Sequence, residues 1–292
     1  PRQMWAVEQL GYYFSTFFDG FSIKKIFATL LAILEMFGLV IFDTPTTPRG
    51  QELDLTGYSL VFEDEFEGNT LNTDVWKYRG NGPRRGGFNA ESQIKIEDGN
   101  MIISGEYLKD GLYGEGWYTG MVSLREKYCK GYFEIRCIVN EGSGFWSAYW
   151  IQADHPYEAE YSQGGVGGCE IDIFESMSYD NFVGKNSVSQ TVHCAGVDGV
   201  QEGFQSNNLG AFYGNNIYKE YNTYGLEWTD EEYIFYINGV ETRRTSFGNG
   251  VSEVPEEVIV SLEIPAEDEL NKLDKDSYKT EYIVDYVRIY QK

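Results

Sequence analysis

Short apolar runs separated by glycine, asparagine and aspartate fill the chain after Gly57, and no long amphipathic helical pattern appears there. Runs of this length and spacing are typical of β-strands joined by tight turns. We predict strands at Met101–Ser104, Gly131–Val139, Tyr233–Ile237, Val258–Leu262 and Tyr282–Tyr290. Asn238-Gly239 predicts a two-residue hairpin turn after the third of these. The expected fold is all-β: a β-sandwich jelly roll with a concave substrate cleft.

Residues 1–50 break this pattern and are expected to form a helical, apolar N-terminal extension that ends in a proline-containing linker. The segment Ile26–Phe42 is apolar except at Thr29, Glu35 and Gly38. A membrane-spanning helix needs about 20 apolar residues, so this segment is marginal. Three alternatives stay open: helices packed on the domain, on each other or on a partner copy, attachment to a membrane through residues 1–42, and a signal peptide. Residues 51–292 form the second unit, a domain of their own.

Acidic and apolar residues alternate in Cys169–Ser176, which reads CEIDIFES. In a strand, alternate residues share a face, so Glu170 and Asp172 would point the same way despite their like charges. Glu175 would point to the other face unless one extra residue were accommodated before it. A β-bulge does this, and bulges are frequent next to active sites. We therefore predict a bulge near Ile173–Phe174.

With such a bulge, the carboxyl groups of Glu170 and Glu175 would lie about 5–6 Å apart, near the ~5–5.5 Å of retaining glycosidases. Asp172 between them would disfavour a second negative charge and help to keep one glutamate protonated. The alternative is a solvated acidic edge of a sheet. The pattern favours a pair of catalytic carboxylates.

The same segment resembles the Glu-x-Asp-x-x-Glu signature of glycoside hydrolase family 16, in the bulged form of laminarinases, agarases, carrageenases and endo-β-galactosidases. The resemblance implies that Glu170 is the nucleophile, Asp172 the assisting acid and Glu175 the acid/base of a retaining endo-β-glycoside hydrolase that acts by double displacement. Further segments resemble family motifs in the same order: Leu60–Gly68, Asn89–Gln93, Tyr118–Gly120, Lys130–Arg136, Gly144–Trp150, Tyr224–Trp228 and Val284–Tyr290.

Aromatic residues make up 16% of the chain and supply candidates for sugar-binding platforms. The candidates are Trp117, Trp146, Trp150 and Trp228, of which we expect two to contact sugar, with Trp117 and Trp146 the better prospects. The alternative is that these rings fill the core.

Polar candidates for substrate binding come from two segments. Asn89, Glu91 and Gln93 alternate and would share one face, and the resemblance assigns their segment to the glycone side of the cleft. His193, in a strand expected beside Glu170, is either a hydrogen-bonding group of the cleft or a structural histidine.

The resemblance also implies a calcium ion on the convex side, held by the carboxylate of Asp285 and the carbonyl of Gly105, since calcium prefers oxygen ligands. Catalysis itself is expected to need no cofactor. No Cys-x-x-Cys or Cys/His spacing indicates zinc.

A net charge of −23 argues against nucleic acid and sulfated polysaccharides as partners. We therefore expect a neutral β-linked polysaccharide, first a β-1,3- or mixed-linkage β-1,3-1,4-glucan, and an extracellular or cell-surface location. The stretch Gly164–Gly168 lacks the Trp-Pro pair of laminarinases. An endo-β-galactosidase of galactan or host-type glycans is therefore an alternative, as are a transglycosylase and a non-catalytic carbohydrate-binding protein.

Four cysteines are present, and two of them adjoin expected cleft residues. Cys169 precedes Glu170 and Cys194 follows His193, so the two thiols could meet on the face opposite the cleft. A disulfide and a pair of free buried cysteines both stay open. Cys129 and Cys137 flank one strand and would lie too far apart to bond.

Overall fold

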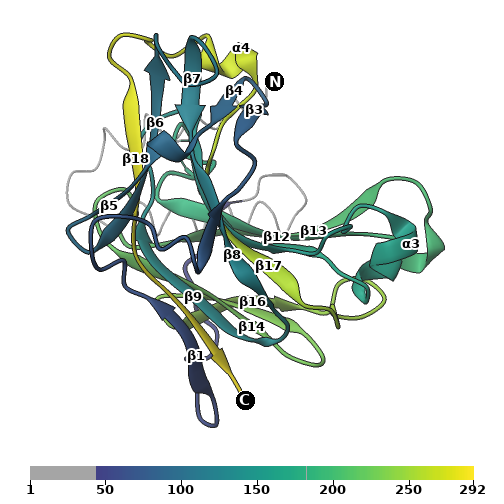
Figure 1. The fold of residues 1–292 in the computed structure, drawn as a ribbon. Coiled ribbons are helices and arrows are strands. Elements are labelled where there is room, and N and C mark those ends of the chain that lie inside the picture. Colours follow the sequence, from purple (N-terminus) through teal and green to yellow (C-terminus); the bar gives the residue numbers. More distant parts are fainter. Residues whose placement is uncertain (1–43, 182) are drawn as a thin grey trace, which may run out of the picture.

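The computed structural model describes residues 44–292 except residue 182, and two β-sheets face each other over most of that length (Figure 1). The expectations for residues 1–42 lie outside the described residues. Within the described part, no helix is long and apolar enough to cross a membrane.

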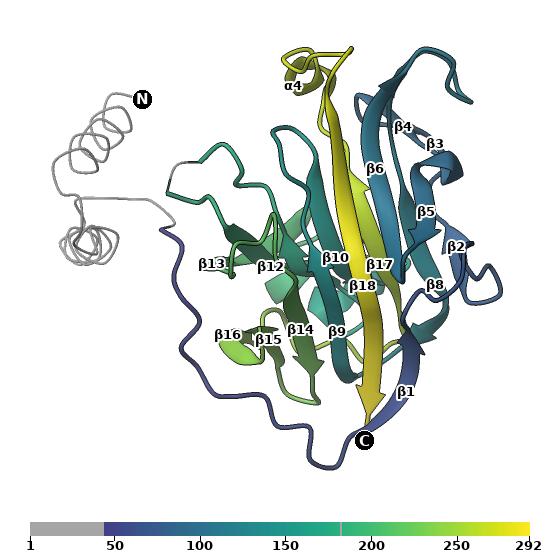
Figure 2. The ribbon, with the colours of Figure 1, turned by 90° about the vertical axis from the view of Figure 1, so that its left-hand side faces the viewer.

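One sheet has eleven strands, with the long strand β18 near its middle (Figure 2). Its strands run in the order β16 (Val240–Thr245), β15 (Tyr233–Ile237), β14 (Asn222–Trp228), β9 (Gly131–Ile138), β18 (Lys279–Gln291), β6 (Asn100–Leu108), β7 (Gly116–Thr119), β4 (Gly87–Asn89) and β3 (Gly82–Arg84). Strand β1 (Ser59–Asp64) also pairs with β18, and β5 (Ile94–Glu97) with β6. All pairs are antiparallel except β4 with β7.

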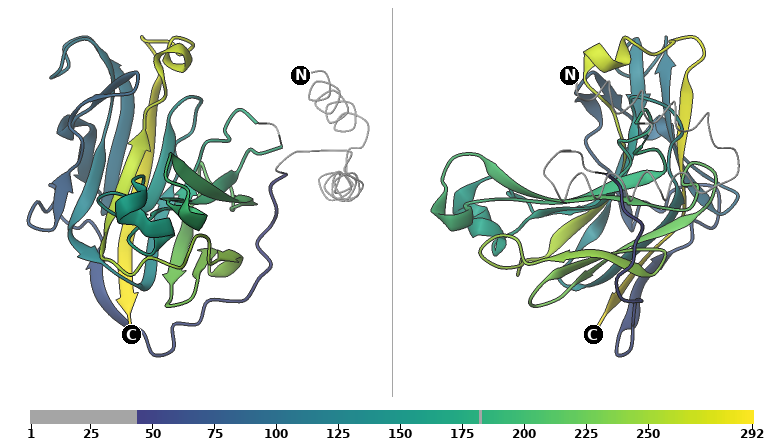
Figure 3. Two further views of the ribbon diagram at one scale, coloured as in Figure 1. Left: turned by 90° about the vertical axis from the view of Figure 1, so that its right-hand side faces the viewer. Right: turned by 180° about the vertical axis from the view of Figure 1, so that it is seen from behind.

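The other sheet has seven strands and carries the predicted catalytic segment. Its order is β13 (Phe204–Tyr213), β12 (Ser187–Ala195), β11 (Glu170–Glu175), β10 (Trp146–Gln152), β17 (Glu256–Glu263), β8 (Met121–Tyr128) and β2 (Trp76–Tyr78). Helix α3 (Ala159–Ser162) lies against the end of β12 (Figure 3), where Ser162 Oγ accepts a hydrogen bond from Ala195 N. The remaining short helices are α4 (Glu267–Leu270) and the 3-10 turns Glu91–Gln93, Gln163–Gly165 and Val197–Gly199.

The core lies between the sheets and is built from one face of each strand. On β11, Ile171, Ile173 and Phe174 are fully buried in it. The predicted turn at Asn238-Gly239 joins β15 to β16, and both residues have positive φ (51° and 74°), as a type I′ hairpin turn requires. The all-β sandwich predicted from the sequence is confirmed.

Residues 46–53 run along an edge of each sheet, although the sequence assigned residues up to 50 to a linker. Thr46 pairs with the edge strand β13, where its N–H donates to Ala211 O. Farther on, Gly50 N donates to Glu241 O of the edge strand β16. The segment thereby covers strand edges that would otherwise be open to other chains.

Candidate active site

The cleft lies on the outer face of the seven-stranded sheet. Ala148 and Trp150 line it, and they form a small buried cluster with Met121 and Ile259 that is separate from the main core. Four carboxylates line it: Glu170, Asp172, Glu175 and Glu263. The three acids of the predicted catalytic segment therefore meet in one cleft.

A bulge in β11 brings Glu175 to the cleft face. On the neighbouring strand β10, Tyr149 pairs with Phe174 and Trp150 pairs with Asp172, so Ile173 is skipped. The register with β12 shifts across the same residues. Since Ile173 and Phe174 both enter the core, the next residue returns to the cleft. The bulge predicted from the parity of the acidic residues is confirmed.

Glu170 is held by two neutral donors. Its Oε2 accepts hydrogen bonds from Gln152 Nε2 and from the hydroxyl of Tyr157. Burial and the charge of Glu170 raise the pKa of Tyr157, so its hydroxyl keeps the proton that it donates. These two hydrogen bonds fix the orientation of the Glu170 carboxyl group in the cleft.

Glu175 has the opposite preference. Burial, followed by the charge of Asp172, raises the pKa of Glu175 to about 8. One donor works against this shift: Trp146 Nε1 lies 2.9 Å from Glu175 Oε1. At neutral pH the side chain therefore carries a proton, which a general acid requires.

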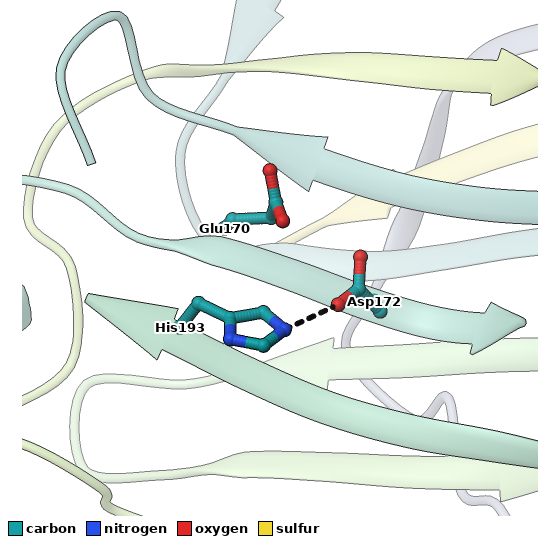
Figure 4. Close-up of side chains that lie close together, drawn as sticks. All are labelled: Glu170, Asp172 and His193. Carbon is teal, nitrogen blue, oxygen red and sulfur yellow. Dashed lines mark ion pairs between the residues drawn. The ribbon is translucent and has the colours of Figure 1, made fainter. Parts of the chain in front are cut away.

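Asp172 lies beside His193, one strand away (Figure 4). His193 Nε2 is 3.2 Å from Asp172 Oδ2, and His193 Nδ1 is 2.6 Å from Ser206 Oγ. Burial and the charge of Glu170 raise the pKa of Asp172. His193 is thus held by two side chains, and one of them, Asp172, lines the cleft.

These three side chains are also the candidate for a cation site. Ligand atoms of Glu170, Asp172 and His193 lie within 4.8 Å of one another. Each of them already has a hydrogen-bonding partner within the protein, which accounts for the cluster without an ion.

A row of arginines forms one wall of the cleft. Arg84 Nη2 and Arg85 Nη1 both approach Glu263 Oε2, at 2.5 and 3.0 Å. Arg79 Nε lies 2.9 Å from Glu257 Oε2. The cleft therefore contains cationic side chains, although the chain as a whole has a net charge of −23.

These cleft residues were missed in the sequence, as were Gln152 and Tyr157. The adjacent arginines at 84 and 85 in so acidic a chain were the available signal. Their partner, Glu263, lies 179 residues away from Arg84.

Of the four candidate tryptophans, two lie at the cleft and two lie in the core. Trp150 lines the cleft under the guanidinium of Arg79, and Trp146 contacts Glu175 and lies 4.8 Å below Arg85. Trp117, expected as a platform, is instead 4% exposed and packs on Tyr107, Phe145 and Tyr278. Trp228 is likewise a core residue. The expectation for Trp117 is wrong because its indole fills the sandwich.

Asn89, Glu91 and Gln93 do not share a face. The chain forms a 3-10 turn at Glu91–Gln93 instead of continuing a strand. Asn89 and Gln93 are buried, whereas Glu91 is exposed. The period of two, on which the expectation rested, does not apply to a turn.

Asp285 and Gly105 cannot bind one calcium ion together. Gly105 pairs with Thr280 on β18, five residues before Asp285, which corresponds to about 16 Å along the strand. Asp285 instead forms an ion pair with Arg136. The residues therefore do not fit the implied ion, and this expectation is wrong.

Comparisons with known proteins point to one family. The family model described as "Beta-porphyranase A-D, GH16 domain" matches residues 60–292. A glucan endo-1,3-beta-glucosidase A1 of Niallia circulans is 26% identical over 221 residues, which are 67% of this chain and 30% of that enzyme. A beta-glucanase of Rhodothermus marinus is 24% identical over 80% of this chain and 85% of its own length.

Among solved structures, SCLam, a non-specific endo-beta-1,3(4)-glucanase, shares the fold. Its TM-score is 0.64 at 22% identity, over 85% of this chain and 97% of SCLam. The present chain spans less than a third of the Niallia circulans protein.

Proposed function

The chain belongs to glycoside hydrolase family 16, and from this premise we propose that it is a retaining endo-β-glycoside hydrolase. The observation that carries the proposal is the bulge of β11, which brings Glu170, Asp172 and Glu175 into one cleft, where the pKa of Glu175 is raised to about 8. A hydrolase of this kind needs one carboxylate as nucleophile and one protonated carboxyl as acid.

In the first step, the carboxylate of Glu170 attacks the anomeric carbon while Glu175 donates its proton to the leaving oxygen. The product is a glycosyl ester of Glu170. In the second step, Glu175, now ionised, takes a proton from water, whose oxygen attacks the same carbon and releases Glu170. A sugar hydroxyl in place of that water would give transglycosylation.

Asp172 and its neighbours prepare these steps without a cofactor. The negative charge of Asp172 raises the pKa of Glu175, and Asp172 is itself held by His193. Gln152 and Tyr157 orient Glu170 for attack. Trp146 and Trp150 supply aromatic surface at the cleft for the sugar rings.

Our first choice of substrate is a β-1,3- or mixed-linkage β-1,3-1,4-glucan, supported by the names of the curated relatives. Such polymers are too large to enter a cell, so an extracellular or cell-surface location is part of the proposal. The arginines in the cleft are paired with Glu257 and Glu263, which suits a neutral chain.

A galactan is the second candidate, because the matching family model is of the porphyranase type. The glycine-rich segment that leads to β11 also lacks the indole of laminarinases. Initial rates on laminarin, barley β-glucan, agarose, porphyran and mucin glycans separate the two candidates. Failure on both glucans would overturn the first choice and leave the mechanism intact.

The mechanism is tested by removing the nucleophile. The Glu170→Ala variant should lose hydrolysis of the substrate identified by that survey. Azide should restore turnover of an aryl glycoside of the same sugar and give the α-glycosyl azide by a single displacement. Unchanged hydrolysis by Glu170→Gln would refute the assignment, as would a β-glycosyl azide from Glu170→Ala.

A further inference from the structure

Two cysteines lie directly behind the candidate active site. Glu170 and His193 face each other across the antiparallel pair β11–β12. One step farther along the same register, Cys169 faces Cys194. Both thiols are on the core side of the sheet, and both residues are fully buried.

The backbone hydrogen bonds of Cys169 show that Cys169 and Cys194 form a non-hydrogen-bonded pair of the antiparallel ladder. Cys169 O accepts a hydrogen bond from Ala153 N, and Cys169 N donates to Glu256 Oε1 at 2.9 Å. Both groups therefore turn toward β10 and β17 and away from β12. Facing residues without mutual backbone hydrogen bonds have Cα atoms about 4.5 Å apart. Disulfides span about 4.4–6.8 Å between Cα atoms.

The two sulfurs border the same small space. A Cβ placed on Gly165 would lie 3.2 Å from Cys169 Sγ and 3.5 Å from Cys194 Sγ. Gly165 has a φ of 108°, so the loop passes over both thiols without a side chain. The hydrogen bond between the thiols raises the pKa of Cys169 and lowers that of Cys194, as expected for groups in contact.

We propose that Cys169 and Cys194 are joined by a disulfide in the mature protein, and that this bond fixes the strands that carry Glu170 and His193. The oxidant is a small-molecule or protein disulfide. One cysteine thiolate attacks a sulfur of the oxidant and releases a thiolate. The other cysteine thiolate then attacks the mixed disulfide and releases the second half. The protein thiols lose two protons and two electrons, and the oxidant becomes two thiols.

The burial of both thiols determines the stage of folding at which this exchange occurs. Because both thiols are enclosed, exchange takes place before the sandwich closes, and the finished bond is shielded from reductants. The bond closes a loop of about 25 residues, for which the chain-entropy account gives a clear stabilisation. This inference is independent of the substrate and of the roles assigned to the carboxylates.

The test counts thiols in the full chain, folded in a mixture of reduced and oxidised glutathione. After denaturation without reductant, N-ethylmaleimide should label Cys129 and Cys137, and the peptides of Cys169 and Cys194 should appear as one linked species. In the Cys169→Ala variant, Cys194 should be labelled as well. Four labelled cysteines in the wild-type chain would overturn the proposal, as would a different linked pair.

A second readout measures the consequence of the bond. Chain refolded in reductant should melt about 5–8 °C below the oxidised chain. The Cys169→Ala/Cys194→Ala double variant should melt at one temperature under both conditions, because its remaining cysteines are the same in each. Equal melting temperatures of oxidised and reduced wild-type chain would contradict a bond that fixes β11 to β12.

Discussion

Replacing Trp146 by phenylalanine should shift the pH dependence of catalysis to higher pH. The substitution keeps an aromatic ring at the cleft but removes the indole N–H that lies 2.9 Å from Glu175 Oε1. That N–H forms a stronger hydrogen bond with the ionised carboxylate than with the protonated carboxyl, and so it lowers the pKa of Glu175. Without it, the carboxyl should hold its proton more tightly.

The size of the shift follows from the strength of such a bond. A hydrogen bond to a charged group contributes about 1.5–3 kcal/mol. At about 1.36 kcal/mol per pKa unit, its loss raises the pKa by roughly one to two units. Burial and Asp172 already raise the pKa of Glu175 to about 8. The alkaline limb of kcat/KM should therefore move from about pH 8 to about pH 9–10.

The assay is the initial rate of reducing-end release between pH 5 and pH 10, at substrate concentrations well below KM. Trp150→Phe is the matched control. It also removes an indole N–H from the cleft, but that group lies 3.1 Å from Ser261 Oγ and not from a catalytic acid. Its alkaline limb should stay in place. A Trp146→Phe profile with an unmoved alkaline limb and a lower kcat/KM at every pH would show that Trp146 is only a sugar platform and would refute this reasoning.

Three further substitutions test the electrostatics. Asp172→Asn removes a charge that raises the pKa of Glu175, so the alkaline limb of kcat/KM should move to lower pH; an upward shift would contradict the assignment. Tyr157→Phe removes a donor that orients Glu170, so kcat/KM should fall at every pH, and an unchanged kcat/KM would contradict the positioning role of Tyr157. Burial raises the pKa of Glu256 to about 8, so the folded chain binds more protons than the unfolded chain above about pH 4.5. Its contribution to the unfolding free energy is present below pH 4.5 and falls by up to about 5 kcal/mol as the pH rises to 8. Glu256→Gln should therefore melt progressively higher than wild type as the pH rises from 5 to 9, and parallel melting curves would refute this.

The three acids of the site could be predicted from a local pattern because their directions depend on the geometry of a single strand. The bulge follows from the parity of three acids within one strand, and its register confirms it. The same parity argument failed at Asn89 and Glu91, since the chain turns there instead of extending. Parity predicts side-chain direction only where a strand forms.

Contacts between distant segments were beyond such reasoning. Glu263 meets Arg84 across 179 residues, and no pattern in the chain connects them. Trp117 could not be told from a cleft tryptophan, because an indole has the same apolar surface in a core as under a sugar. Tyr157 donates to Glu170 from the loop after β10, and no strand or helix pattern predicts the direction of a loop side chain.

The division of the site between near and distant segments has a consequence for folding order. Glu170, Asp172, Glu175 and His193 belong to two consecutive strands and so need only a short loop to close. The arginine wall requires residues near 84 to meet residues near 263. Since contacts of low sequence separation form first, we expect the carboxylates to gather before their basic neighbours arrive. Pulse-labelled hydrogen exchange should show amides of β11 and β12 protected earlier than those of β3 and β17. The chain would pass through an intermediate whose acids are already together, and mild acidity should speed its formation.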